Sequence, residues 1–323
     1  MSPTVRDMTA PTRRALAVQA AAAAVAACAP RGGAATTLTV GYQKNGVLLL
    51  AKSRGVVDRL MGPVPIKWVE FPSGPPLLEA MNAGAVDLGA TGDTPPIFAQ
   101  AAGSALQYVA YQPLSGLGEG LVVPADSPIR RLAELRGKRI AFTKASSSHL
   151  LVANALASAG LTLAEVQPIF LSPSDAASAF ARRAVDAWGI WDPFLALVQR
   201  DQKARVLVNG GQLPRTDAFY LASNAVISRA PQALGRLLDA LRAEAIWGRA
   251  NRDEVVKIVS SANGLPPDIV DTSLRRGDLA VEPLDHAAVV RQQAAAETLQ
   301  TISVIPNKIR VAEAAWSGWR PKS

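Results

Sequence analysis

The pattern of hydrophobic and polar positions after Thr36 alternates between short β-like runs and segments with helical spacing. Strands are predicted at 37–42, 66–71 and 85–91, and helices at 46–61, 76–84 and 95–103. Glycines at 84 and 103 end the last two helices, as glycine commonly does. This alternation is typical of an α/β fold with a largely parallel sheet.

The same pattern restarts about one hundred residues later. VGYQK at 40–44 has a counterpart in IAFTK at 140–144. AVDLGATGDTPP, which begins at Ala85, has a counterpart in AVDAWGIWDP, which begins at Ala184. Two matched strand-to-helix junctions at nearly one offset predict two α/β lobes built on one plan.

A Gly- and Pro-rich segment, PLSGLGEGLVVPADSP, separates the two halves. The economical arrangement is a first lobe of residues 36–119 plus 224–323 and a second lobe of residues 120–223. Two short strands, 121–123 and 218–223, would cross between the lobes as a two-strand hinge. Such an architecture closes on a ligand in the cleft between its lobes. After the second crossing the sequence is helical in pattern to its end.

The first 35 residues are predicted to be an export signal and leader. Three arginines precede an apolar run, 15–27, that is too short to span a membrane stably. Cys28 follows VAA, which resembles the lipobox of bacterial lipoproteins. Lipidation at Cys28 and an ordinary signal peptide cut near an Ala-x-Ala site both remain open, as does a twin-arginine signal. In either case we expect a periplasmic protein, either soluble or tethered at its N-terminus.

Composition narrows the function classes. The net charge of +8 comes without long Lys/Arg runs and with only 5% aromatic residues, which favours a solvated basic surface over a nucleic-acid-binding face. One Cys and two His exclude a disulfide framework and a Cys/His zinc site, and no cofactor is expected. No P-loop, HExxH or GxSxG motif is present, and GLGEG at 116–120 lacks the context of a dinucleotide fingerprint. We therefore expect a monomeric binding protein rather than an enzyme.

Three strand-to-helix junctions offer donors for an anion: Ser73–Gly74, Thr91–Gly92 and the serine turn SSSH at 146–149. Ligands of open α/β sheets bind at the carboxyl ends of the strands, where such junctions lie. Glycine lets the backbone approach a ligand, and the first-turn N–H groups of a helix favour negative charge. Plain helix capping is the alternative at each junction. Mostly neutral donors suit a sulfonate or sulfate, whereas an arginine cluster would suit a carboxylate or phosphate.

The segment WGIWDPF adds an organic half to the predicted site. Asp192–Pro193 is interpreted as the N-cap and first residue of a helix. Trp188 and Trp191 could pack on an apolar or amine-bearing tail, with the core as the alternative for Trp188. Asp93 would repel an anion if it pointed inward, so we expect it to stabilise a turn or to accept from a protonated ligand group.

Taken together, GYQK, EFPSGPPLLEAMNAGAVDLGATGDTPPIFAQAAG, KASSSH and AVDAWGIWDPF resemble the aliphatic-sulfonate-binding proteins of bacterial ABC importers. These belong to the nitrate, taurine and sulfonate group of periplasmic binding proteins. The resemblance implies a type II, two-lobed periplasmic binding protein fold that closes on an alkanesulfonate and delivers it to a permease with an ATPase, for sulfur acquisition. By position, the implied ligand contacts are Gln43, Ser73, Gly74, Thr91, Gly92, Asp93, Ser147, Ser148, His149, Trp188 and Asp192.

Some features leave the ligand open. Relatives usually carry Gly and Ala around the serine turn, where this chain has Ala145 and Ser148. Taurine, nitrate or another small anion is the alternative ligand on the same fold. An enzyme of this fold would need more His or Cys than the chain has. The ligand-sensing domain of a transcription regulator fits poorly with an export signal and without a helix-turn-helix.

Overall fold

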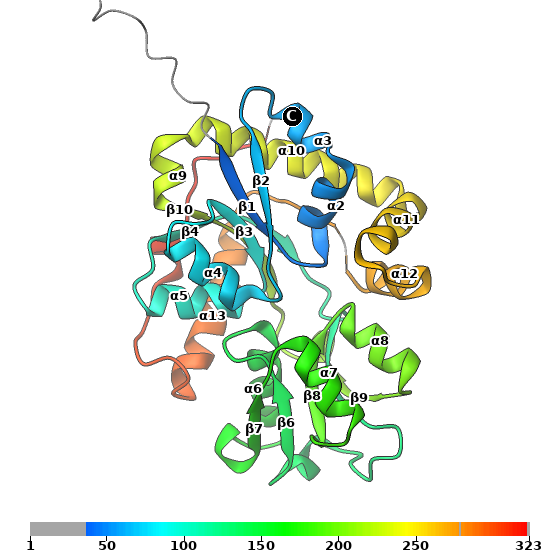
Figure 1. Cartoon of the computed structure of the whole chain (residues 1–323). Coiled ribbons are helices and arrows are strands. Elements are labelled where there is room, and N and C mark those ends of the chain that lie inside the picture. Colours follow the sequence, from blue (N-terminus) through cyan, green and yellow to red (C-terminus); the bar gives the residue numbers. More distant parts are fainter. Residues whose placement is uncertain (1–36, 278, 322–323) are drawn as a thin grey trace, which may run out of the picture. The chain divides into compact units, whose positions relative to one another are not determined.

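The computed structural model describes residues 37–277 and 279–321, so the predicted leader and Cys28 lie outside the described residues. The described chain contains two five-stranded sheets, which confirm the α/β expectation (Figure 1). The first sheet contains, in spatial order, β2 (Ile66–Glu70), β1 (Leu38–Tyr42), β3 (Leu88–Thr91), β10 (Asp217–Ser223) and β4 (Leu106–Pro113). The second contains β7 (Gln167–Phe170), β6 (Arg139–Phe142), β8 (Ala187–Trp191), β5 (Glu119–Val123) and β9 (Arg205–Asn209).

Helices cover both faces of the first sheet, because its strands carry apolar side chains on both sides. One face packs on α2 (Gly46–Arg54), α3 (Val56–Leu60), α9 (Asn224–Arg229), α10 (Pro231–Ala250), α11 (Arg252–Asn263) and α12 (Pro267–Arg276). The other packs on α4 (Gly74–Asn82), α5 (Thr94–Ala101) and α13 (His286–Thr301). The predicted single helix at 46–61 is divided between α2 and α3, because Gly55 has a left-handed backbone (φ 60°).

The second sheet is covered in the same way. Its one face packs on α6 (Ser147–Ser158), and its other face packs on α7 (Pro173–Ala181) and α8 (Phe194–Asp201). None of the helices in the described ranges is both long and apolar enough to cross a bilayer.

The repeated AVD tripeptide makes the same contacts in both lobes. In the first, the Thr39 N–H donates to Asp87 Oδ2 (2.9 Å) and the Asp87 N–H donates to the Thr39 carbonyl (2.8 Å). In the second, the Arg139 N–H donates to Asp186 Oδ2 (2.8 Å) and the Asp186 N–H donates to the Arg139 carbonyl (2.8 Å). The two aspartates therefore fasten β3 and β8 to the starts of β1 and β6, which confirms that the lobes share one plan.

The chain passes from the first sheet to the second between β4 and β5, and returns between β9 and β10. One strand differs from the predicted lobe limits. Strand β10 falls within 120–223, yet it pairs with β3 and β4 of the first sheet along its length. The return crossing therefore precedes Asp217, because this first residue of β10 already pairs with Pro113 of β4 in the first sheet. The remaining lobe limits and the hinge stay predictions.

The C-terminal segment departs from the predicted helix. After α13 only a short 3₁₀ turn, Val311–Ala314, follows, and the Trp316 N–H donates to the carbonyl of Tyr108 on β4 (2.9 Å). Buried Trp319 then donates from Nε1 to Asp239 Oδ1 of α10 (2.9 Å). These contacts fasten the end of the described chain to the first lobe.

Candidate functional site

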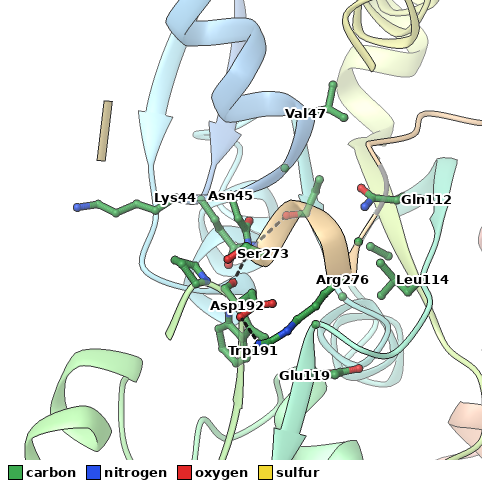
Figure 2. A pocket seen from close by; sticks show the side chains of 18 of the residues that line it. Lys44, Asn45, Val47, Gln112, Leu114, Glu119, Trp191, Asp192, Ser273 and Arg276 are labelled. Carbon is green, nitrogen blue, oxygen red and sulfur yellow. Dashed lines mark hydrogen bonds and ion pairs between the residues drawn. The ribbon is translucent and has the colours of Figure 1, made fainter. Parts of the chain in front are cut away.

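A cavity of about 240 Å³ is lined by residues of both lobes. The first lobe contributes the loop after β1, the starts of α4 and α5, and side chains of α11 and α12. The second contributes the start of β5, the serine turn before α6 and the end of β8. Figure 2 shows Lys44, Asn45, Glu119, Trp191 and Asp192 around this space. The cavity therefore lies at the strand-to-helix junctions, as expected for open α/β sheets.

Serine N-caps behave differently at the cavity and away from it. Ser172 and Ser223, which begin α7 and α9, accept a hydrogen bond from a first-turn N–H of their own helix. Ser73 and Ser146, which begin α4 and α6, make no such side-chain cap. The Ser146 hydroxyl donates instead to the Thr143 carbonyl (2.7 Å). Ser73 has no N–H to accept from at the second and third positions of α4, because Pro75 and Pro76 lack one. Ser146 makes no cap at α6, where first-turn N–H groups are available to an anion.

Two glycines allow the helix starts to approach one another. A Cβ on Gly74 would lie 2.7 Å from Cγ of Pro95, the second residue of α5. A Cβ on Gly92 would lie 2.9 Å from Cβ of Ser147, the first residue of α6. Both distances are too short for a real side chain. Gly74 and Gly92 therefore allow the starts of α4, α5 and α6 to lie close together.

Six of the eleven predicted contacts line the cavity: Gln43, Gly74, Thr91, Gly92, Ser147 and Asp192. Gln43 Nε2 donates to the Ala90 carbonyl (3.0 Å), which orients the side chain along β3. The Thr91 hydroxyl donates to the Gly92 carbonyl (2.9 Å). The hydroxyl oxygen can still accept a hydrogen bond, and its proton can be donated to a ligand instead of to Gly92. Their roles as ligand contacts remain predictions.

The other five predicted contacts do not line this cavity: Ser73, Asp93, Ser148, His149 and Trp188. The Ser148 hydroxyl is buried and lies 2.8 Å from the Ser146 hydroxyl. Ser73 is also buried, while its neighbour Gly74 reaches the cavity. Successive helix residues are rotated by about 100°, so Ser147 and its neighbours cannot all face the ligand.

His149 lies two residues beyond Ser147 on α6 and faces an aromatic group. Its ring centroid is 5.0 Å from that of Phe142 and 6.0 Å from that of Phe98, and it lines a second cavity with Phe170. Its Nδ1 accepts the Ala145 N–H (3.3 Å). Burial, together with Lys144, lowers the pKa of His149 to about 4, so the ring is neutral at physiological pH. The prediction that His149 contacts the ligand is corrected to a packing role.

Trp188 is a core residue, and this corrects its predicted contact with the ligand. It is 1% exposed, and its ring centroid lies 5.8 Å from that of Phe180 and 6.4 Å from that of Phe194. Trp191, at the end of the same strand, lines the cavity instead. The sequence places both tryptophans at the junction, but their distances from the cavity depend on how β8 packs on α7 and α8.

Asp192 belongs to the junction as predicted, although α8 begins at Phe194 rather than at Pro193. Its Oδ1 accepts the Ala196 N–H (3.0 Å) and lies 3.2 Å from Nη1 of Arg276. Arg276 is the last residue of α12, so this ion pair joins the two lobes (Figure 2). Burial raises the pKa of Asp192 to about 6, although Arg276 lowers it. Arg276 has no signal in the sequence that marks it as a cavity residue.

Two buried carboxyl groups lie beside the helix starts. The Asp93 carboxyl group accepts from the Thr94 hydroxyl (2.7 Å). The backbone carbonyl of Asp93 accepts from Gln292 Nε2 (2.6 Å). Burial raises the pKa of Asp93 to about 6. Glu119, the first residue of β5, lines the cavity, and burial together with Asp93 raises its pKa to about 8. Glu119 lies in the GLGEG segment, where only its isolation between glycines could have marked it.

Aliphatic side chains form an apolar wall of the cavity. They come from the crossing segment after β4, from α11 and the turn after it, and from α12 and the chain after it: Leu114, Val255, Val259, Leu265, Val270, Leu274 and Leu279. Helical spacing predicts α11 and α12 but not that these positions face a ligand. Among the described residues, no group of three or more His, Cys, Asp or Glu could hold a metal ion.

Known proteins are similar to this chain in sequence and in fold. Residues 64–258 match the family model for the periplasmic phosphonate-binding protein of ABC transporters. An aliphatic sulfonates-binding protein of Escherichia coli K12 is 37% identical over 281 residues, which are 86% of this chain and 88% of the relative. Another from Bacillus subtilis 168 is 30% identical over 278 residues, 85% of this chain and 84% of the relative.

A solved structure agrees with these relatives. The alkanesulfonate-binding protein SsuA of Xanthomonas axonopodis pv. citri, bound to MOPS, is 39% identical and superposes with a TM-score of 0.84. The match covers 87% of this chain and 98% of that protein, so the two-lobed fold is confirmed over the described chain. The chain therefore belongs to the family of periplasmic substrate-binding proteins of ABC transporters, a family of binding proteins rather than enzymes, with the aliphatic sulfonates-binding proteins among its relatives.

Proposed function

We propose that this protein captures an alkanesulfonate in the periplasm and delivers it to an ABC permease with its ATPase, for sulfur acquisition. The observation that carries the proposal is that one cavity combines the anion-favouring start of α6 with hydroxyl groups and an aliphatic wall. The starts of α4 and α6 lie beside Thr91 and Ser147, and apolar side chains of α11 and α12 line the same cavity. A sulfonate head with an alkyl tail has the same two halves.

The charges around the cavity support a sulfonate head. Arg276 is engaged by Asp192 and by Gln199 Oε1 (2.6 Å). Lys44 has a half-exposed side chain and lies 3.7 Å from Glu70. The other donors that line the cavity are neutral backbone, amide and hydroxyl groups, which suit a permanently ionised head that only accepts hydrogen bonds. A carboxylate or phosphate is more often bound by an unengaged arginine.

Isothermal titration with ethanesulfonate, hexanesulfonate, taurine, sulfate and nitrate tests the proposal. We expect both alkanesulfonates to bind, with hexanesulfonate tighter because each buried methylene group contributes about 0.8 kcal/mol. The same series decides the alternative ligand, which is taurine, nitrate or another small anion. Tighter binding of nitrate or sulfate than of every organic sulfonate would favour that alternative. No heat with any alkanesulfonate would contradict the proposal.

The finer features of location and assembly are also proposals. Closure would use segments 114–118 and 210–216, which join the two sheets, as a hinge between the lobes. Cys28 either carries a lipid or is removed with an ordinary signal peptide. The intact mass of the mature protein from its native membrane and periplasmic fractions distinguishes the two. We expect a monomer, which light scattering during size-exclusion chromatography checks.

A further inference from the structure

Glu119 is an acidic side chain in a cavity that we propose binds an anion. It is 8% exposed, it lines the cavity, and the Ser147 hydroxyl hydrogen-bonds its carboxyl group. Its Cγ lies 3.1 Å from the position that a Cβ on Gly210 would occupy, so backbone restricts it from behind. In Figure 2 Glu119 extends from the start of β5. The carboxyl group therefore lies beside the serine turn, largely removed from solvent.

The charged groups around Glu119 do not neutralise it. Asp93 at the start of α5 raises its pKa by repulsion, and Asp217 of β10 acts on Asp93 in the same way. Three cations of the described residues near this site are paired with other carboxylates. Arg291 of α13 lies 2.6 Å from Asp217. The cavity cations Arg276 and Lys44 pair with Asp192 and Glu70. An ionised Glu119 beside a bound anion would therefore be an unpaired, buried like charge.

A sulfonate cannot relieve this repulsion, because it remains ionised and has no proton to share. Resting on the proposed function, we propose that Glu119 holds a proton when the anion is bound and serves as a proton-bearing donor of the site. Ligand binding is then linked to protonation of this one carboxyl group. The Ser147 hydroxyl, which contacts both the cavity and Glu119, connects the carboxyl group to the anion position.

The direction of the pH dependence follows from the free protein. Burial and Asp93 raise the pKa of Glu119 to about 8, so near pH 7 the group already holds its proton. Above pH 8 the free protein loses this proton and each binding event takes one up. For a bound state that stays protonated, the dissociation constant rises about tenfold between pH 7 and pH 9.

The competing role for Glu119 is an ionised partner for a ligand ammonium group, such as that of taurine. The two roles give opposite results for the isosteric variant Glu119→Gln. Gln is a permanent neutral donor, so it can replace a protonated Glu, and its binding of a simple alkanesulfonate should not change between pH 7 and pH 9. It cannot replace an ionised partner of an ammonium group.

The test is calorimetric titration of ethanesulfonate and of taurine at pH 7 and pH 9 in sulfonate-free buffers. The pH 9 titrations are repeated in Tris and in borate, whose ionisation enthalpies differ. Wild type should take up close to one proton per ethanesulfonate at pH 9 and bind about tenfold more weakly than at pH 7. Glu119→Gln should lose the proton uptake at pH 9 and should show no tenfold fall in ethanesulfonate affinity between pH 7 and pH 9. Glu79→Gln, at an exposed glutamate of α4, is the matched control and should behave as wild type.

Binding of ethanesulfonate at pH 9 without proton uptake would overturn the inference and leave the proposed function intact. So would a Glu119→Gln variant that loses taurine selectively. Absence of ethanesulfonate binding by wild type at both pH values would reject the proposed function itself, and the inference with it. Thermal melting of each variant verifies that it is folded before titration.

Discussion

Arg276 and Asp192 form an ion pair, 3.2 Å between Nη1 and Oδ1, that joins the end of α12 in the first lobe to the end of β8 in the second. Both side chains are largely buried, at 22% and 10% side-chain exposure, so solvent screens the pair only partly. The Asn45 amide also donates to the Asp192 carbonyl across the lobes (3.4 Å). Asp192 is therefore one of the points at which the second lobe contacts the first.

Replacing Arg276 with Met should weaken alkanesulfonate binding by about 1–3 kcal/mol, because closure loses a charge-assisted contact between the lobes. Calorimetric titration measures the loss, and small-angle scattering measures closure. Arg275→Met is the matched control, since Arg275 is exposed and pairs with Asp271 on its own helix. Equal affinity in the two variants would show that the Arg276–Asp192 pair does not contribute to the closed state.

Thr91→Ala should weaken sulfonate binding by about 1–3 kcal/mol if the hydroxyl donates to the anion. Thr91 is 2% exposed and lines the cavity, and its present acceptor is the adjacent Gly92 carbonyl. Thr298→Ala is the control, because Thr298 lies on α13 away from the cavity lining and its hydroxyl donates to the Ala294 carbonyl of its own helix. An unchanged affinity would assign the Thr91 hydroxyl to local turn structure.

The two tryptophans of β8 should separate folding from binding. Trp188→Ala should lower the free energy of unfolding by about 3–5 kcal/mol, because it leaves a cavity among Phe180 and Phe194. Trp191→Ala should cost less stability and should weaken hexanesulfonate more than ethanesulfonate, because Trp191 lines the cavity. Urea unfolding and titration with the two ligands measure these effects. The reverse pattern would return the ligand contact to Trp188.

Glu119 also predicts how stability depends on pH. Its pKa is raised in the folded protein from 4.5 to about 8, so the folded state binds more protons than the unfolded state in this window. The contribution of Glu119 to the free energy of unfolding therefore falls as pH rises from about 4.5 to about 8. Glu119→Gln removes this dependence. The free energy of unfolding of the variant, relative to wild type, should therefore rise by on the order of 2–4 kcal/mol between pH 4.5 and pH 8. Parallel urea curves for the two proteins at all pH values would contradict this.

Ala145 precedes the serine turn with a left-handed backbone, φ 61°, which an alanine adopts at a cost. Ala145→Gly should therefore raise the free energy of unfolding by up to about 1 kcal/mol, the relief of strain being partly offset by the entropy of glycine in the unfolded chain. Ala157→Gly, at an exposed position inside α6, should instead lower it by about 1 kcal/mol. Urea unfolding compares the two, and a loss of stability in both would indicate that position 145 is not strained.

Local chemistry in the sequence was sufficient to predict the two lobes and their junctions. The AVD repeat predicts one plan because Asp87 and Asp186 occupy the same turn, and each aspartate bonds the backbone of the neighbouring strand. Proline in the first helical turn and glycine before it predict where α4 and α5 begin, since both act on the backbone of adjacent residues. Such patterns act on a few neighbouring positions, so they can be interpreted without the structure of the rest of the molecule.

Only the tertiary structure decides which side chains face the cavity. Ser147 and His149 are two residues apart, yet the packing of α6 on the second sheet directs one to the cavity and the other to an aromatic group. Arg276 and the apolar wall reach the cavity from helices far along the chain. Helical spacing predicts that these helices have a buried face, but not that this face lines a cavity. Glu119 becomes a titrating donor only because distant segments bury it beside Asp93. Facing and burial are long-range properties, because they depend on how layers pack rather than on local conformational preference.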